Sequence, residues 1–384
     1  MIRSTILTKT APERALLVAV ATKEGRDRSP TEASIEELAL LTGTAGANVV
    51  GKLVQRLPIP SKTHYLGKGK LEELLALKNS ANYNVVIFDD ELSPIQQRNL
   101  EEALQVKVID RVALILDIFA RRARTHEGQL QVELAQHQYL LPRLAGQWSH
   151  LERLGGGIGT RGPGESQLET DRRLIRRKIH HLKAQIEEVR KHRALYRQKR
   201  NKSGILVVAL VGYTNSGKST LLNALCQADV FTENKLFATL DPTTRRLMLP
   251  DKRTVLVTDT VGFIRKLPLT IVTSFRATLE ELDEAALLVH IVDLASPDAT
   301  EQCQTVESIL TDLKLIDKPR VTVLNKIDLL LSSDRDWDEA TAINYLSDKF
   351  LDEKTVLISA TKKWGLTRLL ELISRTITEP TTPI

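Results

Sequence analysis

Residues 212–219, with the sequence GYTNSGKS, have the glycine, lysine and serine spacing of a phosphate-binding loop. In such a loop, backbone N–H groups surround the β-phosphate, the lysine (Lys218) reaches the β- and γ-phosphate oxygens, and the following hydroxyl (Ser219) binds Mg²⁺. An apolar, strand-like run at 204–211 precedes the loop and a helix-like run at 220–228 follows it. That order disfavours an ordinary glycine turn, so we expect a nucleoside triphosphate to bind here.

The segment TVLVTDTVG at 254–262 supplies groups for the metal and the γ-phosphate. Asp259 ends an apolar run, where its carboxylate can hold the metal through water, and the Gly262 N–H can meet the γ-phosphate. Phe263 comes next, where many GTPases have a glutamine that orients the attacking water. A phenyl ring forms no such hydrogen bond, so we expect slow intrinsic hydrolysis and a compensating group from elsewhere in the chain or from a partner.

Two further strand-end motifs indicate that the base is guanine. They are VTVLNKID at 321–328 and VLISAT at 356–361. The Asp328 carboxylate can accept hydrogen bonds from the N1–H and the exocyclic amine of guanine, which adenine does not present in that arrangement. The backbone of Ser359 and Ala360 would face the guanine O6. The order and spacing of these motifs predict a GTPase domain.

Between the loop and Asp259 lies FATLDPTTRR, at 237–246. A switch segment needs a threonine that contacts Mg²⁺ and the γ-phosphate and lets go after hydrolysis. Thr239, Thr243 and Thr244 all satisfy that requirement on spacing alone.

The elements that must position these residues are alternating strands and helices. Short apolar runs alternate with helix-like segments from residue 15 to about 124, and again from 202 to 377. We therefore predict an α/β protein with an N-terminal parallel α/β subdomain (1–124) and a C-terminal P-loop GTPase domain (202–378), followed by a polar tail (379–384).

Residues 125–201 have a different pattern, in which apolar residues recur every three, four or seven positions on both sides of a glycine-rich segment. They are Leu130, Leu134 and Leu141 before it, and Leu168, Ile175, Ile179, Leu182, Ile186 and Val189 after it. Two helices with such narrow apolar seams should pack as an antiparallel hairpin. Its tip would be the loop at 154–165, which holds six of the 19 glycines.

The positive charge of the chain lies in its first half. Lys and Arg outnumber Asp and Glu by 33 to 23 in residues 1–200, whereas they number 21 against 25 in residues 201–384. Residues 171–200 alone hold twelve basic and three acidic side chains. A solvated helix face is one interpretation and a polyanion-binding surface is the other; a membrane surface would be attracted by the same charge.

The composition indicates a globular protein without a membrane-spanning segment. At 384 residues with 42% hydrophobic content, the chain is long enough for two or three packed domains. Its apolar runs are much shorter than the roughly 20 residues needed to cross a bilayer. The N-terminus lacks a signal-peptide pattern and only two cysteines are present, so we expect a cytoplasmic protein, with peripheral membrane association as an alternative.

Several long motifs together resemble the HflX family of ribosome-associated GTPases, in the Obg-like/HflX superfamily of the TRAFAC class. They are YLGKGK (65–70), VIFDDELSPIQQRNLE (86–101), DRVALILDIFARRART (110–125), GGGIGTRGPGESQLETDRR (155–173) and the series GYTNSGKST, FATLD, DTVGF and NKID. The resemblance covers about residues 14–377. It implies an α/β subdomain and a helical hairpin before the GTPase domain. It also implies binding to the large ribosomal subunit and its rRNA, and splitting of stalled 70S ribosomes under stress.

The resemblance also assigns the site. It places the switch threonine at Thr239, implies catalytic roles for Lys218, Thr239 and Gly262, and implies Mg²⁺ ligation by Ser219, Thr239 and Asp259. The residues expected to bind GTP or GDP are Gly212, Tyr213, Thr214, Asn215, Ser216, Gly217, Lys218, Ser219, Thr220, Phe237, Ala238, Thr239, Leu240, Asp241, Asp259, Thr260, Val261, Gly262, Asn325, Lys326, Ile327, Asp328, Ser359, Ala360 and Thr361.

The glycine-rich tip is the expected RNA contact. Its glycines remove side-chain bulk, and arginines beside it can bind phosphates. The expected residues are Gly155, Gly156, Gly157, Gly159, Arg161, Arg172 and Arg173. The resemblance implies that this tip reaches the peptidyl-transferase region.

Two other functions are compatible with the sequence. A nucleotide-gated tether on RNA or a membrane surface would make hydrolysis incidental, which Phe263 and the basic half permit. An ATP-driven RNA remodeller is less well supported, because no second phosphate-binding loop is found in the N-terminal part. We expect a monomer, although no sequence feature reports the oligomeric state.

Overall fold

The fold is described from a computed structural model of the chain. It describes residues 12–21, 30–144, 163–202, 204–226, 236–266, 281–331, 336–350 and 352–378. Contacts divide the chain into two compact units. The first unit comprises residues 1–118 and 139–174, and the second comprises residues 119–138 and 175–384.

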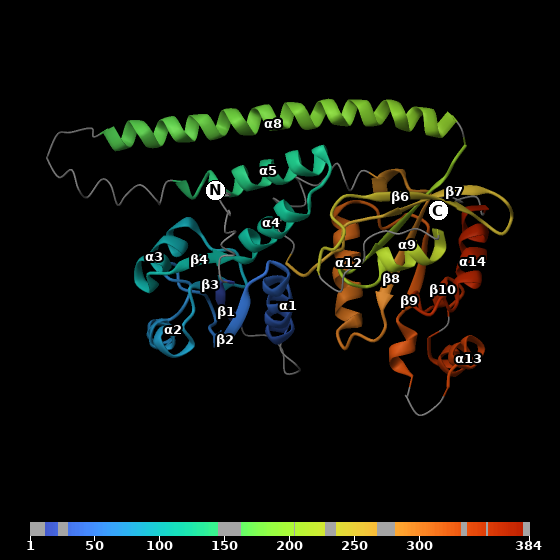
Figure 1. Ribbon diagram of the computed structural model, residues 1–384, viewed down its shortest axis with the longest axis horizontal. Helices are drawn as coiled ribbons and strands as arrows, with labels where there is room; N and C mark the ends of the chain where they lie inside the picture. The colour runs from blue at the N-terminus through green and yellow to red at the C-terminus, as the bar shows by residue number, and fades with distance from the viewer. Residues whose placement is uncertain are drawn as a thin grey trace, which may run out of the picture. The chain divides into compact units, whose positions relative to one another are not determined.

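The first unit is built on a four-stranded parallel sheet with strand order β2-β1-β3-β4 (Figure 1). Its elements are β1 (Arg14–Ala21), α1 (Pro30–Thr44), β2 (Asn48–Arg56), α2 (Lys68–Ala81), β3 (Val85–Phe88), α3 (Pro94–Leu104), β4 (Lys107–Asp110) and the first part of α4 (Arg111–Arg122). A helix joins each strand to the next, as parallel pairing requires. Strand β1 is buried beyond its first residue, because helices cover both faces of such a sheet. The predicted N-terminal parallel sheet is therefore confirmed.

At the end of β4, a buried carboxylate has all of its hydrogen-bonding capacity filled within the first unit. Asp110 accepts from the backbone N–H groups of Leu92 (3.1 Å) and Ala113 (2.9 Å). It also accepts from the Tyr139 hydroxyl (2.9 Å) and the Arg143 guanidinium (3.1 Å). Two bonds to each oxygen, one of them from a cation, compensate the loss of water at this buried site.

The second unit contains a six-stranded sheet with order β10-β9-β8-β5-β7-β6. Its strands are β5 (Val207–Gly212), β6 (Thr243–Met248), β7 (Thr254–Asp259), β8 (Leu287–Asp293), β9 (Arg320–Asn325) and β10 (Thr355–Leu357). Only β6 runs antiparallel to its neighbour; the other pairs are parallel. Around them lie α9 (Lys218–Cys226), α12 (Ala299–Asp312), the short 3₁₀ helix η1 (Ile327–Leu330), α13 (Glu339–Phe350) and α14 (Leu366–Thr378). The parallel arrangement brings the ends of β5, β7, β8 and β9 to one edge, where ligands bind in such folds.

Helices α5 (His126–Leu140) and α8 (Pro163–Lys202) pack side by side through an apolar seam in the second unit (Figure 1). The seam consists of Leu130 and Leu134 of α5 and of Ile179, Leu182, Ile186 and Val189 of α8. Arg193 pairs with Glu127 (2.7 Å) and Lys178 with Glu133 (2.9 Å), so the two helices run in opposite directions. We call residues 126–138 and 175–202 the helical arm. Its antiparallel packing agrees with the seam expected from the sequence, whereas the predicted domain boundaries at 124/125 and 201/202 stay predictions.

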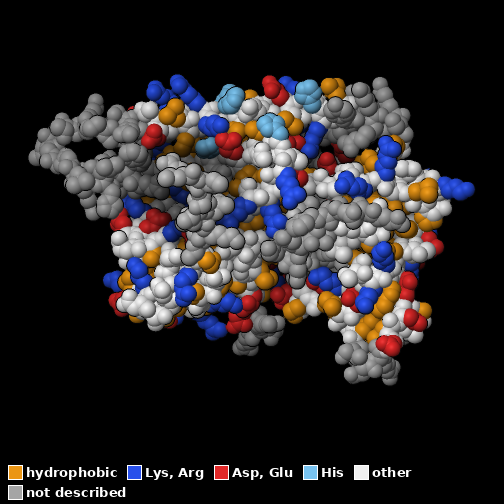
Figure 2. All heavy atoms as spheres, in the orientation of Figure 1, with side chains coloured by type: hydrophobic (Ala, Val, Ile, Leu, Met, Phe, Trp, Pro, Cys, Tyr) orange, Lys and Arg blue, Asp and Glu red, His pale blue; other side chains and the backbone are white. Residues whose placement is uncertain are grey.

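The side of α8 away from the seam is rich in exposed cations. Figure 2 shows Lys, Arg and His side chains along the edge where α8 lies in Figure 1. The exposed ones include Arg173, Arg176, Arg177, Lys183, Arg190 and Lys191. Among the residues that the structure describes, no helix combines the length and the apolar character needed to span a bilayer.

Candidate nucleotide-binding site

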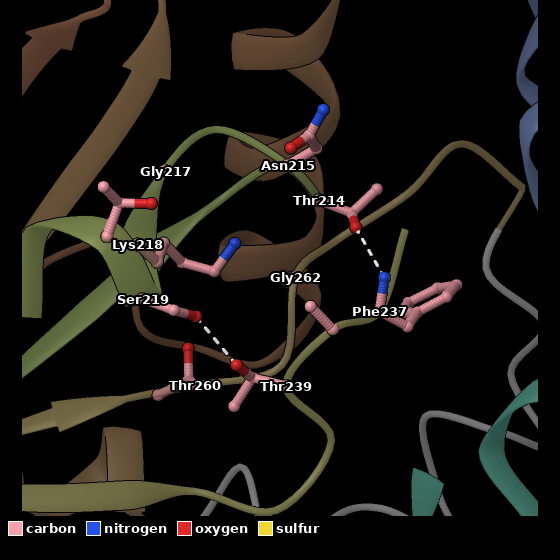
Figure 3. A pocket seen from close by; sticks show the side chains of 11 residues that line it. Thr214, Asn215, Gly217, Lys218, Ser219, Phe237, Thr239, Thr260 and Gly262 are labelled. Carbon is pink, nitrogen blue, oxygen red and sulfur yellow. Dashed lines mark hydrogen bonds between the residues drawn. The ribbon is translucent and has the colours of Figure 1, made fainter. Parts of the chain in front are cut away.

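The loop after β5 and the start of α9 form one wall of a pocket (Figure 3). The pocket is lined by Thr214, Asn215, Gly217, Lys218, Ser219, Thr220, Phe237, Ala238, Thr239, Thr260 and Gly262. These residues come from three separate segments: the loop, the segment after residue 235, and the segment after β7. The structure thus brings together much of the set expected from the sequence, and α9 points its N-terminal end, with its partial positive charge, at the space between them.

Two glycines of the loop are required by its geometry. Gly217 has φ +99°, and a Cβ there would lie 2.2 Å from Nδ2 of Asn325. Gly212 has φ +152°, and its Cβ would lie 2.3 Å from the backbone oxygen of Ile291. Any side chain at these positions would therefore push the loop off the neighbouring strands β8 and β9.

Lys218 is the cation of the pocket. Its Nζ is buried and donates to the backbone oxygens of Tyr213 (2.8 Å) and Gly212 (3.2 Å). Within the described part of the chain, Lys218 forms no ion pair at salt-bridge distance. Burial lowers the pKa of Lys218 to about 8, an effect that the negative charge of Asp259 opposes. A bound phosphate would supply the negatively charged partner that this ammonium lacks at salt-bridge distance.

Three oxygen-bearing side chains beside Lys218 form a cluster suited to a hard divalent cation. Ser219 Oγ donates to Asp259 Oδ2 (2.5 Å) and lies 2.7 Å from the Thr239 hydroxyl (Figure 3). Asp259 is fully buried, and its second oxygen, Oδ1, has no hydrogen-bond partner. Burial raises the pKa of this carboxyl, against the effect of Lys218 and of the two hydroxyls. Hydroxyl and carboxylate oxygens are the ligands that Mg²⁺ prefers, so the cluster fits that ion.

The structure separates the three threonines that spacing alone left as alternatives. Thr239 lies beside Ser219 in the pocket, whereas Thr243 and Thr244 belong to strand β6. The Thr244 hydroxyl lies 2.9 Å from that of Thr258 on the neighbouring strand β7. Geometry therefore favours Thr239 as the switch threonine.

Gly262 and Phe263 hold the segment after β7 against the loop. The Phe263 N–H donates to Gly212 O (3.1 Å), and the Thr214 N–H donates to Phe263 O (2.7 Å). A Cβ on Gly262 would lie 2.6 Å from Cα of Thr214 and 3.0 Å from Nζ of Lys218. The Phe263 side chain is 2% exposed and does not line the pocket. Packing is thus its observed role, and it offers no hydrogen bond to a water in the site.

The predicted base-recognition residues meet at the end of β9. Asn325 donates to Ser216 O (2.9 Å) and accepts from the Ala360 N–H (3.1 Å), which ties the loop to the segment after β10. Lys326 pairs with Asp293 at the end of β8 (2.7 Å). Ile327 is buried, and the half-buried Asp328 lies in η1.

The rest of this predicted set lies beside these residues. Ser359 is buried and its hydroxyl accepts from the Lys362 N–H (3.1 Å), while Thr361 is exposed. Asp328, Ser359 and Ala360 do not line the pocket described above, so their contact with a base stays a prediction.

Known proteins are similar to this chain over most of its length. Three family models match successive parts of the chain: "GTP-binding GTPase N-terminal" (residues 32–120), "GTP-binding GTPase Middle Region" (122–200) and "50S ribosome-binding GTPase" (207–326). The GTPase HflX of Caldanaerobacter subterraneus subsp. tengcongensis is 52% identical over 96% of this chain and 82% of its own. The GTPase HflX of Alkalihalophilus pseudofirmus is 52% identical over 81% of this chain and 74% of its own. A solved structure, the SsGBP and GDP complex, is similar with a TM-score of 0.48 and 25% identity, covering 95% of this chain and 98% of that chain.

The chain belongs to the HflX family of GTPases. The family resemblance seen in the sequence motifs is confirmed, and so is the expectation of a GTP-hydrolysing enzyme with a P-loop domain.

In this HflX-family chain, the segment FATLD has contacts that the sequence did not predict. Phe237 donates its N–H to Thr214 Oγ1 (3.1 Å), but its ring packs edge-on against Phe119 of α4, with centroids 4.8 Å apart. Ala238 lines the pocket and Leu240 is buried. The Asp241 carboxylate does not line the pocket and bonds to the residues at the start of α5.

These partners of FATLD were missed because nothing in the sequence links them to it. Phe119 fits an ordinary core position in an apolar helix. Thr125 and Gly128 fit an ordinary helix start, and Thr125 is 116 residues from Asp241. A helix start at Thr125 was the only local signal.

Of the residues expected to contact RNA, the structure describes Arg172 and Arg173. Gly155, Gly156, Gly157, Gly159 and Arg161 lie outside the described residues. Arg172 and Arg173 lie in α8, Arg172 half-buried and Arg173 exposed. A phosphate-binding role for Arg173 is therefore sterically open.

Proposed function

We propose that this HflX-family enzyme is a Mg²⁺-dependent GTPase that binds the large ribosomal subunit through its rRNA and separates stalled 70S ribosomes under stress. In this proposal the ribosome stimulates GTP hydrolysis. The observation that carries it is the helical arm, a basic helix pair that packs in the same compact unit as the nucleotide pocket. The matched family model described as "50S ribosome-binding GTPase" supports the same function.

The pocket residues have separable roles in hydrolysis. Lys218, already buried, would stabilise the charge that develops between the β- and γ-phosphates. Ser219, Thr239 and Asp259 would hold Mg²⁺, which when bound neutralises phosphate charge. The Gly262 N–H would contact the γ-phosphate, where a side chain would meet Lys218 and Thr214.

The buried Phe263 is consistent with stimulation of hydrolysis by a ribosome. Its ring packs in the protein and offers no hydrogen bond to an attacking water, so the group that orients this water must come from another residue or from the ribosome. Slow hydrolysis in solution would then keep GTP bound until the large subunit is reached.

Exposed cations on α8 would supply affinity for RNA. Neutralising phosphates with Lys and Arg releases counterions, so binding should weaken steeply with salt. Specific contacts are expected from the glycine-rich tip, which lies outside the described residues. We also infer a cytoplasmic monomer, with peripheral membrane association as an alternative location.

The test compares GTP hydrolysis by the purified chain with and without large ribosomal subunits. Stimulation of at least about tenfold is expected, with small subunits alone as the control. Light scattering of 70S particles would then follow their separation. A rate unchanged by large subunits would refute the proposal. Arg173→Gln should weaken subunit binding, whereas Lys354→Gln, which removes an exposed lysine of the second unit, should not.

A second candidate function is a nucleotide-gated tether in which hydrolysis is incidental. The buried Phe263 favours it, because such a protein needs no rapid turnover. Multiple turnovers on ribosomes would exclude the tether, and a single slow event per binding would support it.

A further inference from the structure

The segment FATLD connects the nucleotide pocket to the beginning of the helical arm. Its centre faces the pocket, where the Thr239 hydroxyl lies 2.7 Å from Ser219 Oγ. Two residues later, the Asp241 carboxylate accepts hydrogen bonds from the backbone N–H groups of Arg124 (2.8 Å) and Thr125 (2.9 Å). All of these residues belong to the second unit. Within two residues, therefore, the chain passes from a candidate magnesium ligand to the start of α5.

Asp241 also contacts the first turn of α5 through a threonine. The Thr125 hydroxyl donates to Asp241 Oδ1 (2.5 Å) and at the same time accepts from the Gly128 N–H (3.0 Å). Thr125 thereby caps the helix while it is itself held by Asp241. A negative carboxylate at this end is further favoured by the helix dipole.

The absence of a side chain at Gly128 leaves room for the Asp241 carboxylate. A Cβ on Gly128 would lie 2.3 Å from Asp241 Oδ1 and 3.0 Å from Thr125 Oγ1. The missing side chain therefore lets the carboxylate reach the helix start. On the other side of Thr239, the Phe237 ring packs on Phe119 of α4, so FATLD is held against the α4–α5 corner at both ends.

We propose that Asp241 is a positioning residue that couples the γ-phosphate state of the pocket to the start of the helical arm. When GTP and Mg²⁺ hold Thr239, Asp241 is placed against Arg124 and Thr125. When the γ-phosphate leaves, Thr239 loses that anchor and the Asp241 contact weakens with it. The inference rests on the proposed role of Thr239 as a magnesium ligand, and it adds a route by which hydrolysis would change the surface proposed to bind RNA.

Thermodynamic linkage makes the coupling between GTP binding and the Asp241 contact reciprocal. If GTP strengthens the Asp241 contact, the contact strengthens GTP binding by the same factor and leaves GDP binding little changed. Removing it should therefore lower the affinity for a non-hydrolysable GTP analogue about five- to tenfold relative to GDP, in the usual range of such couplings. A purely structural role would weaken both nucleotides equally.

The experiment measures amide hydrogen exchange of the full chain with Mg²⁺ and either GDP or the GTP analogue. In the unmodified protein, exchange across residues 119–130 should be at least about tenfold slower with the analogue, because the N–H groups of Arg124 and Thr125 are then bonded. In Asp241→Asn this difference should fall below about twofold. The nucleotide affinities of the same samples give the ratio described above.

Two further variants separate coupling from loss of structure. Gly128→Ala displaces the carboxylate without changing its charge, and alanine favours a helix more than glycine does, so a weaker helix would not explain a loss. It should reproduce the effect of Asp241→Asn. Asp338→Asn is the control, because Asp338 is likewise a carboxylate at a helix start, where it accepts from the Thr341 N–H (2.8 Å) of α13 by a contact local in the sequence. It should speed exchange there and leave residues 119–130 unchanged.

Each outcome decides the proposal. An equal loss of GDP and analogue affinity in Asp241→Asn would overturn it. So would an unchanged exchange difference in both arm variants, the absence of any difference in the unmodified protein, or a loss of the difference in Asp338→Asn. None of these measurements uses a ribosome. Their failure leaves ribosome-stimulated hydrolysis to be judged by its own test, and the failure of that stimulation leaves the coupling standing.

Discussion

Two fully buried aspartates end parallel strands in the two units, and their surroundings differ. Asp110, the last residue of β4 in the first unit, accepts four hydrogen bonds, one of them from the Arg143 guanidinium. Asp259, the last residue of β7 in the second unit, bonds to Ser219 and leaves Oδ1 without a partner, while nearby Lys218 donates only to backbone oxygens.

The comparison teaches where a ligand is needed. A buried polar atom without a partner costs free energy, and a protein retains it where something else supplies the missing interaction. In the first unit, the side chains satisfy one another and stabilise the fold. In the second unit, Lys218 lines the pocket and forms no ion pair with any described residue, and Asp259, whose Oδ1 has no partner, bonds to the pocket residue Ser219. This arrangement matches a nucleotide phosphate and its metal.

The largest expected effect is on stability and concerns Asp110, whose oxygens all have hydrogen-bond partners. Asp110→Asn removes the buried anion beside Arg143, whose guanidinium then keeps only the exposed, more distant Glu91 (3.7 Å) as an ionic partner. The new amide NH₂ would also face groups that donate hydrogen bonds to the present carboxylate. The free energy of unfolding, measured by urea denaturation, should fall by about 3–5 kcal/mol, while GTP affinity stays within about twofold. Asp259→Asn is the matched control: no comparable loss of stability is expected there, but Mg²⁺-dependent GTP binding should weaken. Equal losses of stability in both variants would remove the distinction between the two sites.

The next effect concerns Lys218, the buried cation that forms no ion pair within the described residues. Lys218→Ala should slow GTP hydrolysis at least about 100-fold, which corresponds to about 3 kcal/mol of lost transition-state stabilisation. Stability should be unchanged or higher, because the variant removes a desolvated charge. Single-turnover rates and urea denaturation of the same preparation give both quantities. A large loss of stability with normal hydrolysis would show that Lys218 acts as Asp110 does.

A smaller effect extends the comparison to the end of β9. Asp328→Asn should relax the preference for guanine, because an amide cannot accept from both donor groups of that base. The selectivity for GTP over ATP should fall by about 1.5–3 kcal/mol, the range for a hydrogen bond to a charged group. Competition binding with the two nucleotides measures it. Unchanged selectivity would place base recognition elsewhere.

The last effect, which is the smallest per pH unit, concerns a buried histidine in the sheet of the second unit. Burial, with Arg320 and Lys218 adding to it, lowers the pKa of His290 to about 4, below the usual value of 6.5. The unfolded chain therefore binds more protons between pH 6.5 and 4, and stability falls as the pH drops through that window. The expected slope is at most about 1.4 kcal/mol per pH unit. Denaturation curves for His290→Asn should show a flatter pH dependence; an unchanged slope would assign the effect to other groups.

Much of the fold was predictable because its signals are local. Apolar runs separated by helix-like segments predicted a parallel sheet in the N-terminal part of the chain and a second α/β unit in the C-terminal part. The seam spacing predicted the antiparallel packing of α5 on α8. The same holds for the loop at 212–219, where glycines and a helix start define a backbone shape for phosphate. The guanine contacts and the RNA contacts of the tip stay predictions.

Other features depended on residues distant in the sequence. Spacing alone left Thr239, Thr243 and Thr244 as equal candidates, and the family resemblance chose Thr239. The structure agrees with that choice, because Thr243 and Thr244 lie in β6 and do not line the pocket. Asp241 was grouped with the nucleotide ligands by its position in FATLD, but its carboxylate bonds to the start of α5.

By itself, the sequence determined the family, the GTPase chemistry and the kinds of elements, because these follow from short motifs and periodic burial. Only the tertiary structure decided which buried polar groups have partners and which are left for a ligand. Partnership is set by side chains from separate elements meeting at one place, as Asp110 meets Arg143 and Asp241 meets Thr125, and no local pattern records such a meeting.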